Sequence, residues 1–303
     1  MIRAGISGWT YPKWRNAFYP PGLPRKRELA FASRRFPTIE VNGSFYSLQT
    51  PRAYRSWARE TPDGFVFAVK GGRFITHMKK LKDVDQALAN FFASGVLALG
   101  KKLGPILWQF PPQLGFDRPR FEKFFASLPK NFSQAGKLAR KHDAKIKGRA
   151  FLRTEVAGRI RYAVEIRHPS FLVPEFFSLL RKYRIAFVIA DSAGRFPYRE
   201  EVTADFVYVR LHGGSELYVS GYAPADIARW ARRIRKWEGS GKKKRDVYVY
   251  FDNDAKVHAP YDAASLIAKL HSRRRTRRDL TGAAWKRRGS ELEPGFIGSA
   301  PGV

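Results

Sequence analysis

The chain has 303 residues, of which 44% are hydrophobic, so it can bury a large core as one α/β domain or as two ordinary ones. It contains no cysteine, which excludes disulfides and thiolate metal sites. The 57 Lys and Arg against 26 Asp and Glu give a formal net charge of +31, which attracts polyanions and makes nucleic acid a candidate partner.

Eight apolar or β-branched runs recur along the chain and predict eight strands. The first is IRAGIS and the last is VYVYFD. The predicted strands span residues 2–7, 38–42, 65–70, 105–110, 161–167, 185–191, 206–212 and 247–252.

Helix-like segments lie between most of these strands, and five of them have a proline in the first turn, where its missing N–H group is not needed. The prolines are Pro51, Pro119, Pro174, Pro224 and Pro260. The predicted helices span residues 25–35, 51–61, 83–99, 118–127, 172–183, 224–237 and 260–271. This alternation favours a (β/α)₈ TIM barrel over an open doubly wound sheet, and no G-x-G-x-x-G motif follows the first strand.

Lys and Arg are concentrated in three segments, at residues 137–161, 229–245 and 273–280. The first belongs to a basic insertion at about 131–160 within a single barrel domain of residues 1–271. Residues 272–303 are rich in Gly, Ser, Pro and charge, so we expect a disordered basic tail. The N-terminus has no signal-peptide pattern and no apolar run reaches about 18 residues. We therefore expect a cytoplasmic protein with no membrane partner.

Strand parity predicts which side chains face the barrel interior, because successive residues of a strand point to opposite sides. If the apolar positions meet the helices, the opposite positions are polar and lie near the carboxyl ends of the strands, where barrel active sites form. The predicted interior set is Glu40, Asn42, Lys70, Gln109, Glu165, Arg167, Asp191, Arg210, His212 and Asp252. The two glutamates and two arginines could instead form a buried, self-neutralising ion network.

Seven motifs occur in order along residues 1–271: GISGWTYPKWRNAFYP, TIEVNGSFY, FVFAVKGGRFITH, LGPILWQFPPQL, YAVEIRHPSF, FVYVRLHG and YVYFDNDAKVHAP. Together they resemble the YecE-like family of bacterial TIM barrels, a domain of unknown function. The resemblance implies a TIM barrel, but it brings no reaction, cofactor or catalytic residue. The family usually has Asn-Asn-Asp after the last strand, whereas this chain has Asp252, Asn253 and Asp254, so no role for a neutral amide at 252 is implied.

The mixture of charges in the predicted interior suits a small anionic substrate, because Arg and Lys side chains bind phosphate and carboxylate groups. A carboxylate, Glu165 or Asp191, would serve as the general base, and His212 or His168 as the acid. The predicted substrate-binding residues are Glu40, Asn42, Lys70, Gln109, Arg167, Arg210, Asp252, Asn253, Trp9 and Tyr46. The glycines of the loop HGGSELYVSGY, residues 212–222, would let backbone N–H groups approach an anion, or would only turn the chain.

A divalent metal is a less favoured cofactor. Strand ends offer oxygen and nitrogen ligands at Glu165, Asp191, His212 and Asp252. The cations predicted in the same cavity would repel a dication, so the cofactor stays undetermined.

Aromatic and histidine side chains follow several strands and should lie over the barrel mouth. Trp9 and Tyr46 follow the first two strands and would stack on a base or sugar ring, or would only plug the barrel. His77 and His258 lie beyond the third and eighth strands. Each is either a site residue or a hydrogen-bond partner that fixes its loop.

Three functions are consistent with these features. The favoured one is an enzyme, hydrolase-like, that acts on an anionic or phosphate-bearing substrate by acid–base or metal-assisted hydrolysis. The first alternative is a nucleic-acid-binding protein or nuclease that uses the basic segments. The second alternative is a barrel that binds a small ligand without catalysis.

Overall fold

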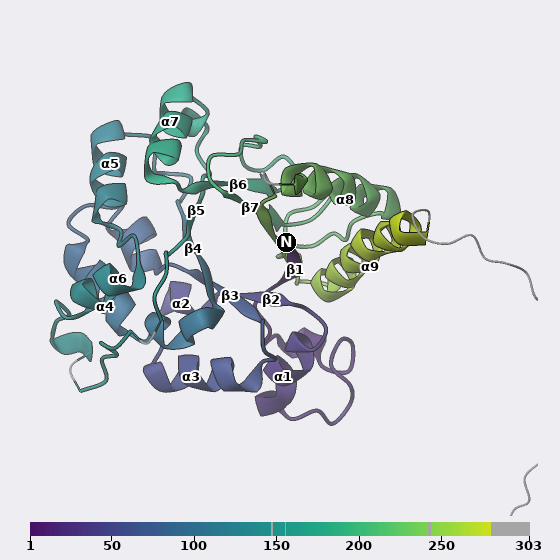
Figure 1. The fold of residues 1–303 in the computed structure, drawn as a ribbon, viewed down its shortest axis with the longest axis horizontal. Coiled ribbons are helices and arrows are strands. Elements are labelled where there is room, and N and C mark those ends of the chain that lie inside the picture. Colours follow the sequence, from purple (N-terminus) through teal and green to yellow (C-terminus); the bar gives the residue numbers. More distant parts are fainter. Residues whose placement is uncertain (147, 155, 242–243, 280–303) are drawn as a thin grey trace, which may run out of the picture.

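Eight parallel strands pair in sequence order and close into a barrel, because β1 pairs with both β2 and β8 (Figure 1). A computed structural model of the chain describes residues 1–279, with gaps at 147, 155 and 242–243. The strands are β1 (Ile2–Ser7), β2 (Thr38–Val41), β3 (Val66–Lys70), β4 (Leu103–Gln109), β5 (Tyr162–Glu165), β6 (Ala186–Asp191), β7 (Phe206–Leu211) and β8 (Asp246–Phe251). Each overlaps its predicted segment, and the (β/α)₈ barrel is confirmed.

Helices surround the barrel and cover its outer face (Figure 1). The α-helices are α1 (Glu28–Ser33), α2 (Gly43–Tyr46), α3 (Pro51–Glu60), α4 (Asp85–Ala93), α5 (Arg118–Ser127), α6 (Phe132–Ala139), α7 (Pro174–Tyr183), α8 (Pro224–Glu238) and α9 (His258–Asp279). Shorter turns are η1 (Pro12–Trp14), η2 (Arg25–Arg27), η3 (Phe74–Met78), η4 (Val96–Lys102), η5 (Ala144–Ile146) and η6 (Pro169–Phe171). Prolines start α3, α7 and α8, as the sequence predicts.

Two apolar cores follow from the strand parity. The larger lies between strands and helices and includes Ile39, Val164 and Val209, all fully buried. The smaller fills the barrel interior and includes Ala68, Leu107, Ala163, Tyr208 and Tyr250. Each of these residues precedes a polar residue at the carboxyl end of its strand by two positions, so both point into the barrel. The polar side chains therefore form the next layer toward the carboxyl ends of the strands.

The parity expectation is wrong for β6. Val188 and Ala190 belong to the interior core, whereas Ile189 belongs to the outer one. Asp191 therefore shares the outer face with Ile189, where its carboxylate accepts a hydrogen bond from the Tyr222 hydroxyl at 3.2 Å. A parallel strand buried on both faces is apolar on both, so its sequence does not reveal which face is interior.

The basic insertion predicted at 131–160 is folded against α4. It contains helix α6, which the sequence analysis missed, and its Ile146 is 1% exposed. The backbone N–H of Phe151 donates to the Ala93 carbonyl of α4 at 2.8 Å. Lys137 and Arg140 remain exposed on its outer side.

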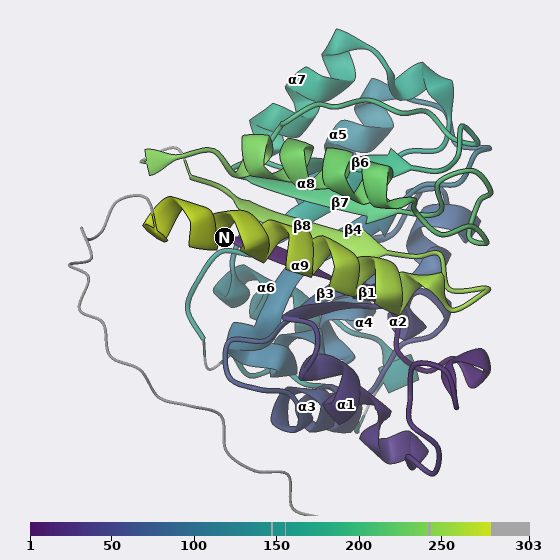
Figure 2. The same cartoon turned by 90° about the vertical axis from the view of Figure 1, so that its right-hand side faces the viewer.

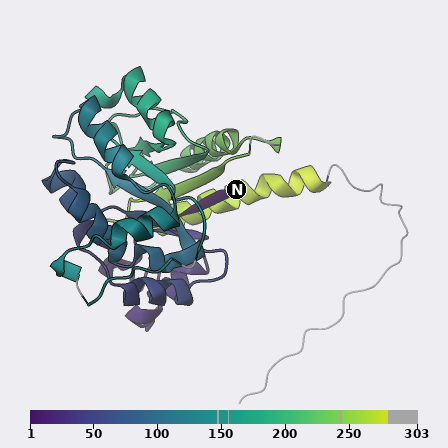
Figure 3. The same ribbon diagram turned by 60° about the vertical axis from the view of Figure 1, so that its left-hand side comes forward.

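The last helix extends beyond the predicted domain boundary at 271. Helix α9 runs to Asp279 and lies beside α8 (Figure 2), and its far end projects from the barrel (Figure 3). Arginine-rich sequence supports continued helix because Arg has good helix propensity. Residues 280–303 of the predicted tail lie outside the described residues. Over residues 1–279, apart from the gaps, no helix combines the length and apolarity that a membrane span needs.

Candidate functional site

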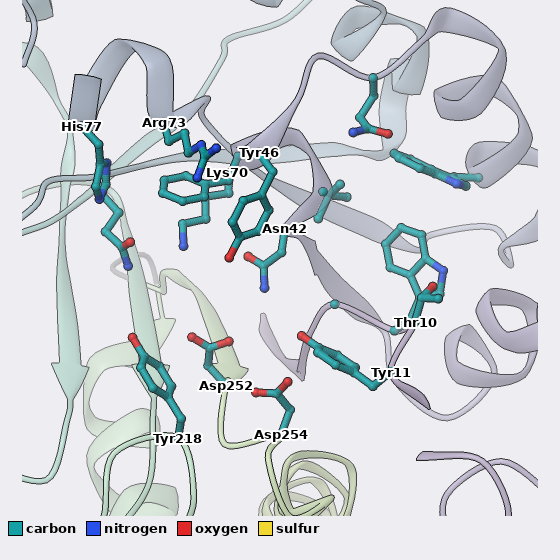
Figure 4. A pocket seen from close by; sticks show the side chains of 18 of the residues that line it. Thr10, Tyr11, Asn42, Tyr46, Lys70, Arg73, His77, Tyr218, Asp252 and Asp254 are labelled. Atoms are coloured by element: carbon teal, nitrogen blue, oxygen red, sulfur yellow. The ribbon is translucent and has the colours of Figure 1, made fainter. Parts of the chain in front are cut away.

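A cavity of about 840 Å³ opens at the carboxyl ends of the strands (Figure 4). Its lining comes from the ends of β1 to β5, β7 and β8 and from the loops that follow them, with no contribution from β6. The lining residues are Gly8, Trp9, Thr10, Tyr11, Val41, Asn42, Gly43, Phe45, Tyr46, Gln49, Trp57, Lys70, Arg73, His77, Met78, Gln109, Arg167, Tyr218, Asp252 and Asp254.

The floor of the cavity is an ion network centred on Arg210, which is fully buried. Its Nε and Nη2 donate to Oε2 and Oε1 of Glu40 at 3.2 and 2.8 Å. Nη1 donates to Oε2 of Glu165 at 2.6 Å, and Nη2 also donates to Oδ2 of Asp252 at 2.8 Å. One guanidinium thus joins strands β2, β5 and β7 and the end of β8 across the barrel interior.

Hydroxyl, amide and imidazole side chains complete the hydrogen bonding of these carboxylates. The hydroxyls of Ser7 and Tyr208 donate to Glu40 at 2.6 and 2.5 Å. Gln109 donates to Oε1 of Glu165 at 2.8 Å. The Nδ1 atom of His212 lies 3.0 Å from Oδ2 of Asp252. Buried charges need hydrogen-bond partners, and these contacts supply them to the carboxylates that surround Arg210.

The network also sets the pKa values of two carboxyls. Burial alone would raise the pKa of Glu165, but Arg210 and then Arg167 outweigh burial and hold it well below its usual range. Burial would likewise raise the pKa of Asp252, and Arg210 with the His212 hydrogen bond holds it low. Both groups therefore remain anionic throughout the physiological pH range and are poor proton carriers.

One side of the cavity is cationic and the opposite side is acidic (Figure 4). Lys70 and Arg73 come from the end of β3. Arg167 follows β5, where its Nη2 donates to the Tyr218 hydroxyl at 2.7 Å and its guanidinium lies 4.3 Å from the centroid of the Phe196 ring. This stacking and hydrogen bonding hold Arg167 in one orientation, with its Nε 3.3 Å from Glu165.

Lys70 is buried, yet its ammonium has no hydrogen bond or ion pair among the described residues. Its Nζ lies 4.3 Å from the centroid of the Phe45 ring. Burial, followed by the Arg210 charge, lowers the pKa of Lys70 to about 8. Gly71, the next residue, packs closely against Trp108, and a Cβ there would come within 2.2 Å of the indole. Only glycine fits there, and this fixes the position from which Lys70 enters the cavity.

The acidic side is formed by Asp252 and Asp254 (Figure 4). Burial, followed by the Asp252 charge, raises the pKa of Asp254 to about 6. On the cationic side, burial and then the Lys70 charge lower the pKa of His77 to about 4. Near neutral pH His77 is therefore uncharged, whereas Asp254 can exchange a proton.

Aromatic rings surround the mouth of the cavity. Trp9 packs edge-on against Trp57, with ring centroids 5.2 Å apart. Phe45 packs edge-on against Tyr46, which is 66% exposed at the rim. Asn42 lies between these groups, and its Oδ1 is buried without a hydrogen-bond partner among the described residues. Its Nδ2 donates to Ser7 at 2.8 Å, which holds the amide against the end of β1.

The family description "Protein of unknown function DUF72" matches residues 3–286. The chain belongs to the DUF72 family. It is 27% identical over 172 residues to the UPF0759 protein YecE of Escherichia coli (strain K12), covering 56% of this chain and 50% of that protein. It is 31% identical over 117 residues to the UPF0759 protein YunF of Bacillus subtilis (strain 168), covering 37% of this chain and 40% of that protein. The alignments thus span half or less of these curated relatives.

Solved DUF72 structures share the fold. A family protein of Thermotoga maritima matches with a TM-score of 0.70 at 24% identity, covering 89% of this chain and 99% of that one. A family protein of Enterococcus faecalis matches with a TM-score of 0.66 at 17% identity, covering 89% of this chain and 96% of that one. The resemblance to YecE-like barrels that the motifs indicate is therefore confirmed.

Most of the substrate-binding residues predicted for this DUF72 chain lie in or under the cavity. Lining residues from the predicted set are Trp9, Asn42, Tyr46, Lys70, Gln109, Arg167 and Asp252. Glu40 and Arg210 lie beneath the cavity in the ion network. Asn253 faces away, because its side chain donates to the Ser220 carbonyl and to Asp262.

The predicted catalytic residues lie apart from the open space. Glu165 and His212 are buried in the network below it. Asp191 lies on the outer face of β6, and burial raises its pKa. The His168 ring accepts a hydrogen bond from the Ser170 N–H at 3.2 Å, capping η6. Neither of the last two residues lines the cavity.

The proposed metal ligands do not converge. Among residues 1–279, outside the gaps, no group of three or more His, Asp or Glu is arranged to hold a metal ion. The Arg210 guanidinium occupies the space between Glu40, Glu165 and Asp252. Asp191 faces away from them.

The glycine-rich loop at 212–222 uses its donors internally. The N–H groups of Ser215 and Glu216 donate to the Ser220 hydroxyl, both at 2.9 Å. The N–H of Gly213 donates to the Tyr222 hydroxyl at 3.2 Å. The loop contributes the Tyr218 side chain to the cavity instead.

Sequence reasoning missed several lining residues in loops, chiefly Arg73, Tyr218 and Asp254. Strand parity gives no information once a strand has ended. Their position in the sequence could have indicated them, because Arg73 and Asp254 each lie three residues after the end of a strand, β3 and β8.

Proposed function

We propose that this DUF72 protein is an enzyme that acts on a small substrate bearing a phosphate or carboxylate group. The observation that carries the proposal is the separation of charge in the cavity. Lys70 and Arg73 lie on one side, and Asp252 and Asp254 lie on the other. Arg167 also lines the cavity. An anionic group bound by the cations would place the rest of the substrate against the carboxylates.

The two arginines would hold the anion. A guanidinium binds phosphate or carboxylate through two parallel hydrogen bonds, which fixes orientation as well as affinity. Arg167 is preorganised by Tyr218 and by stacking on Phe196.

Asp254 would carry the proton in acid–base chemistry. Its pKa of about 6 is close to physiological pH, where a group exchanges protons most effectively. Glu165, favoured from sequence as the base, is held ionised by Arg210 and Gln109. In this proposal Glu165 positions Arg167 and Arg210 rather than accepting a proton.

The proposal is tested by a thermal-shift screen of the full chain against sugar phosphates, nucleotides and dicarboxylates at physiological salt. A ligand that binds only the folded state raises the melting temperature. Compounds that stabilise the protein are then followed for turnover. We expect Asp254→Asn to keep binding and to lose turnover by at least about a hundredfold. Binding without turnover of any stabilising compound would instead favour the non-catalytic alternative.

A second candidate is a nucleic-acid strand as the anionic substrate, favoured by cation–aromatic pairs at the rim and beside it. At the rim, Arg73 lies 5.5 Å from the centroid of the exposed Tyr46 ring. In an adjoining pocket, Lys145 lies 5.5 Å from the centroid of the exposed Phe74 ring. Such pairs stack bases and bind phosphates in single strands. Binding of a short oligonucleotide should then weaken steeply with salt and be reduced by Tyr46→Ala.

A further inference from the structure

Lys70 differs from the two arginines that line the cavity with it. Its side chain is 8% exposed, and its Nζ has no hydrogen bond or ion pair among the described residues. Arg73 is exposed and Arg167 is already bound to Glu165 and Tyr218. An amine that is buried, unpaired and open only to a cavity has the surroundings of a nucleophile rather than of a structural ion pair.

Burial lowers the pKa of Lys70 even though three carboxylates lie nearby. Burial and Arg210 disfavour the ammonium, whereas Asp252, Glu40 and Glu165 favour it, and the net result is a pKa of about 8. His77 beside it has a pKa of about 4 and is neutral near pH 7. A substantial fraction of Lys70 is thus the free amine at physiological pH, in contrast to an exposed lysine.

We infer that the Lys70 amine forms an imine with an aldehyde or ketone group of the substrate. The inference rests on the proposed function and deepens it, because it names the substrate class as an anionic carbonyl compound. Arg73 and Arg167 would hold the anionic group, and the carbonyl carbon would face Nζ. The Phe45 ring, 4.3 Å from Nζ, covers the amine and limits access of water.

The chemical step is balanced without a further reactant. The Nζ lone pair attacks the carbonyl carbon, and the C=O π electrons move to oxygen. The oxygen takes the proton that the attacking nitrogen releases, which gives a neutral carbinolamine. A second proton transfer to that hydroxyl lets it leave as water while the C=N bond forms. Asp254, on the opposite side of the cavity, can supply this proton because burial and Asp252 raise its pKa to about 6.

The test uses D-glyceraldehyde 3-phosphate as the anionic aldehyde and sodium borohydride to reduce any imine to a stable secondary amine. The full chain is treated, digested, and the labelled lysines are mapped by mass spectrometry. We expect Lys70 to be labelled at least about tenfold more than the exposed Lys123 of α5. Uncharged D-glyceraldehyde should label Lys70 at least about tenfold less.

Lys70→Arg keeps the positive charge and removes the nucleophile. This variant should lose the label but keep thermal stabilisation by inorganic phosphate. If Lys70→Arg does not fold, Lys70→Met replaces it in the same labelling experiment. Equal labelling of Lys70 and Lys123 in a protein that phosphate stabilises would overturn the imine and leave the proposed function standing. If the protein shows neither labelling of Lys70 nor stabilisation by phosphate, the proposed function itself is contradicted. Equal labelling of Lys70 by both aldehydes would overturn the anionic substrate class.

Discussion

Arg210 of β7 and Glu40 of β2 form a fully buried pair joined by two hydrogen bonds of 2.8 and 3.2 Å. Two strands, β1 and β8, separate β2 from β7 in the barrel wall, so the pair closes across the interior. The remaining Arg210 nitrogen reaches Glu165. The floor of the cavity is therefore held by one guanidinium whose planar fork matches the positions of its acceptors.

Arg210→Met should destabilise the fold by about 3 to 5 kcal/mol, because Glu40, Glu165 and Asp252 would be left buried without their cation. Arg210→Lys should recover only part of the loss, since an ammonium lacks the planar fork. The half-exposed pair of Arg161 with Asp246 gives the control: Arg161→Met should cost on the order of 1 kcal/mol. Urea unfolding measures all three. Equal losses at both sites would contradict the network's role.

The network should also determine stability in acid. The folded-state pKa values of Glu165 and Asp252 lie below their usual values of 4.5 and 3.8. Their stabilisation is therefore complete above pH 4.5 and is lost as pH falls below these values, when the unfolded chain binds protons more readily. Below pH 4.5, the unfolding free energy of Glu165→Gln should fall less steeply with decreasing pH than that of the wild type, as measured by urea unfolding at each pH. Parallel curves for both proteins would refute this account.

Lys70→Met should stabilise the protein while removing its chemistry. A pKa of about 8 in place of 10.5 means that the charged lysine costs about 3 kcal/mol in the folded state. The cost is complete below pH 8 and fades as pH rises from 8 to 10.5, because the folded protein releases the proton first. The variant's gain in unfolding free energy should therefore be on the order of 1 to 3 kcal/mol at pH 7 and shrink above pH 8. Lys123→Met, at an exposed site, should show neither effect.

Sulfate affinity should rise as pH falls through about 6. Ionised Asp254 repels an anion in the cavity, and its protonation removes that repulsion. Sulfate keeps its own charge over this range, and the lowered pKa values of His77 and Lys70, about 4 and about 8, leave both groups largely in one state near pH 6. We expect roughly threefold to tenfold tighter binding at pH 5 than at pH 7. Asp254→Asn should bind sulfate equally at both pH values in calorimetric titrations; a retained pH dependence would assign it to another group.

The barrel and its polar floor could be predicted because both depend on strand periodicity. Apolar residues alternate with Glu40, Glu165 and Arg210 along β2, β5 and β7, so the interior face is visible in sequence. The alternation disappears in β6, which is apolar on both faces, and this is why Asp191 was misplaced.

Loop residues could not be placed in the same way. Tyr218 reaches the cavity because its loop folds back on His212, whose carbonyl accepts a hydrogen bond from the Tyr218 N–H.

Helix α6 could have been predicted from a local pattern at its start. Asn131 caps the Gln134 N–H, and Gln134 in turn accepts from the Lys130 N–H. An Asn at the N-cap with Gln three residues later is typical of a helix start.

The central claim, that cationic side chains lining the cavity bind the substrate's anionic group, is tested most directly by calorimetric titration of inorganic phosphate at physiological salt. The proteins are the wild type, Arg167→Gln and the surface control Lys123→Gln, which removes the same charge from the outer helix α5. We predict that Arg167→Gln weakens phosphate binding by at least about tenfold, as expected for loss of a charged hydrogen-bond donor. Lys123→Gln should leave it unchanged. Equal phosphate affinities in all three proteins would contradict the account.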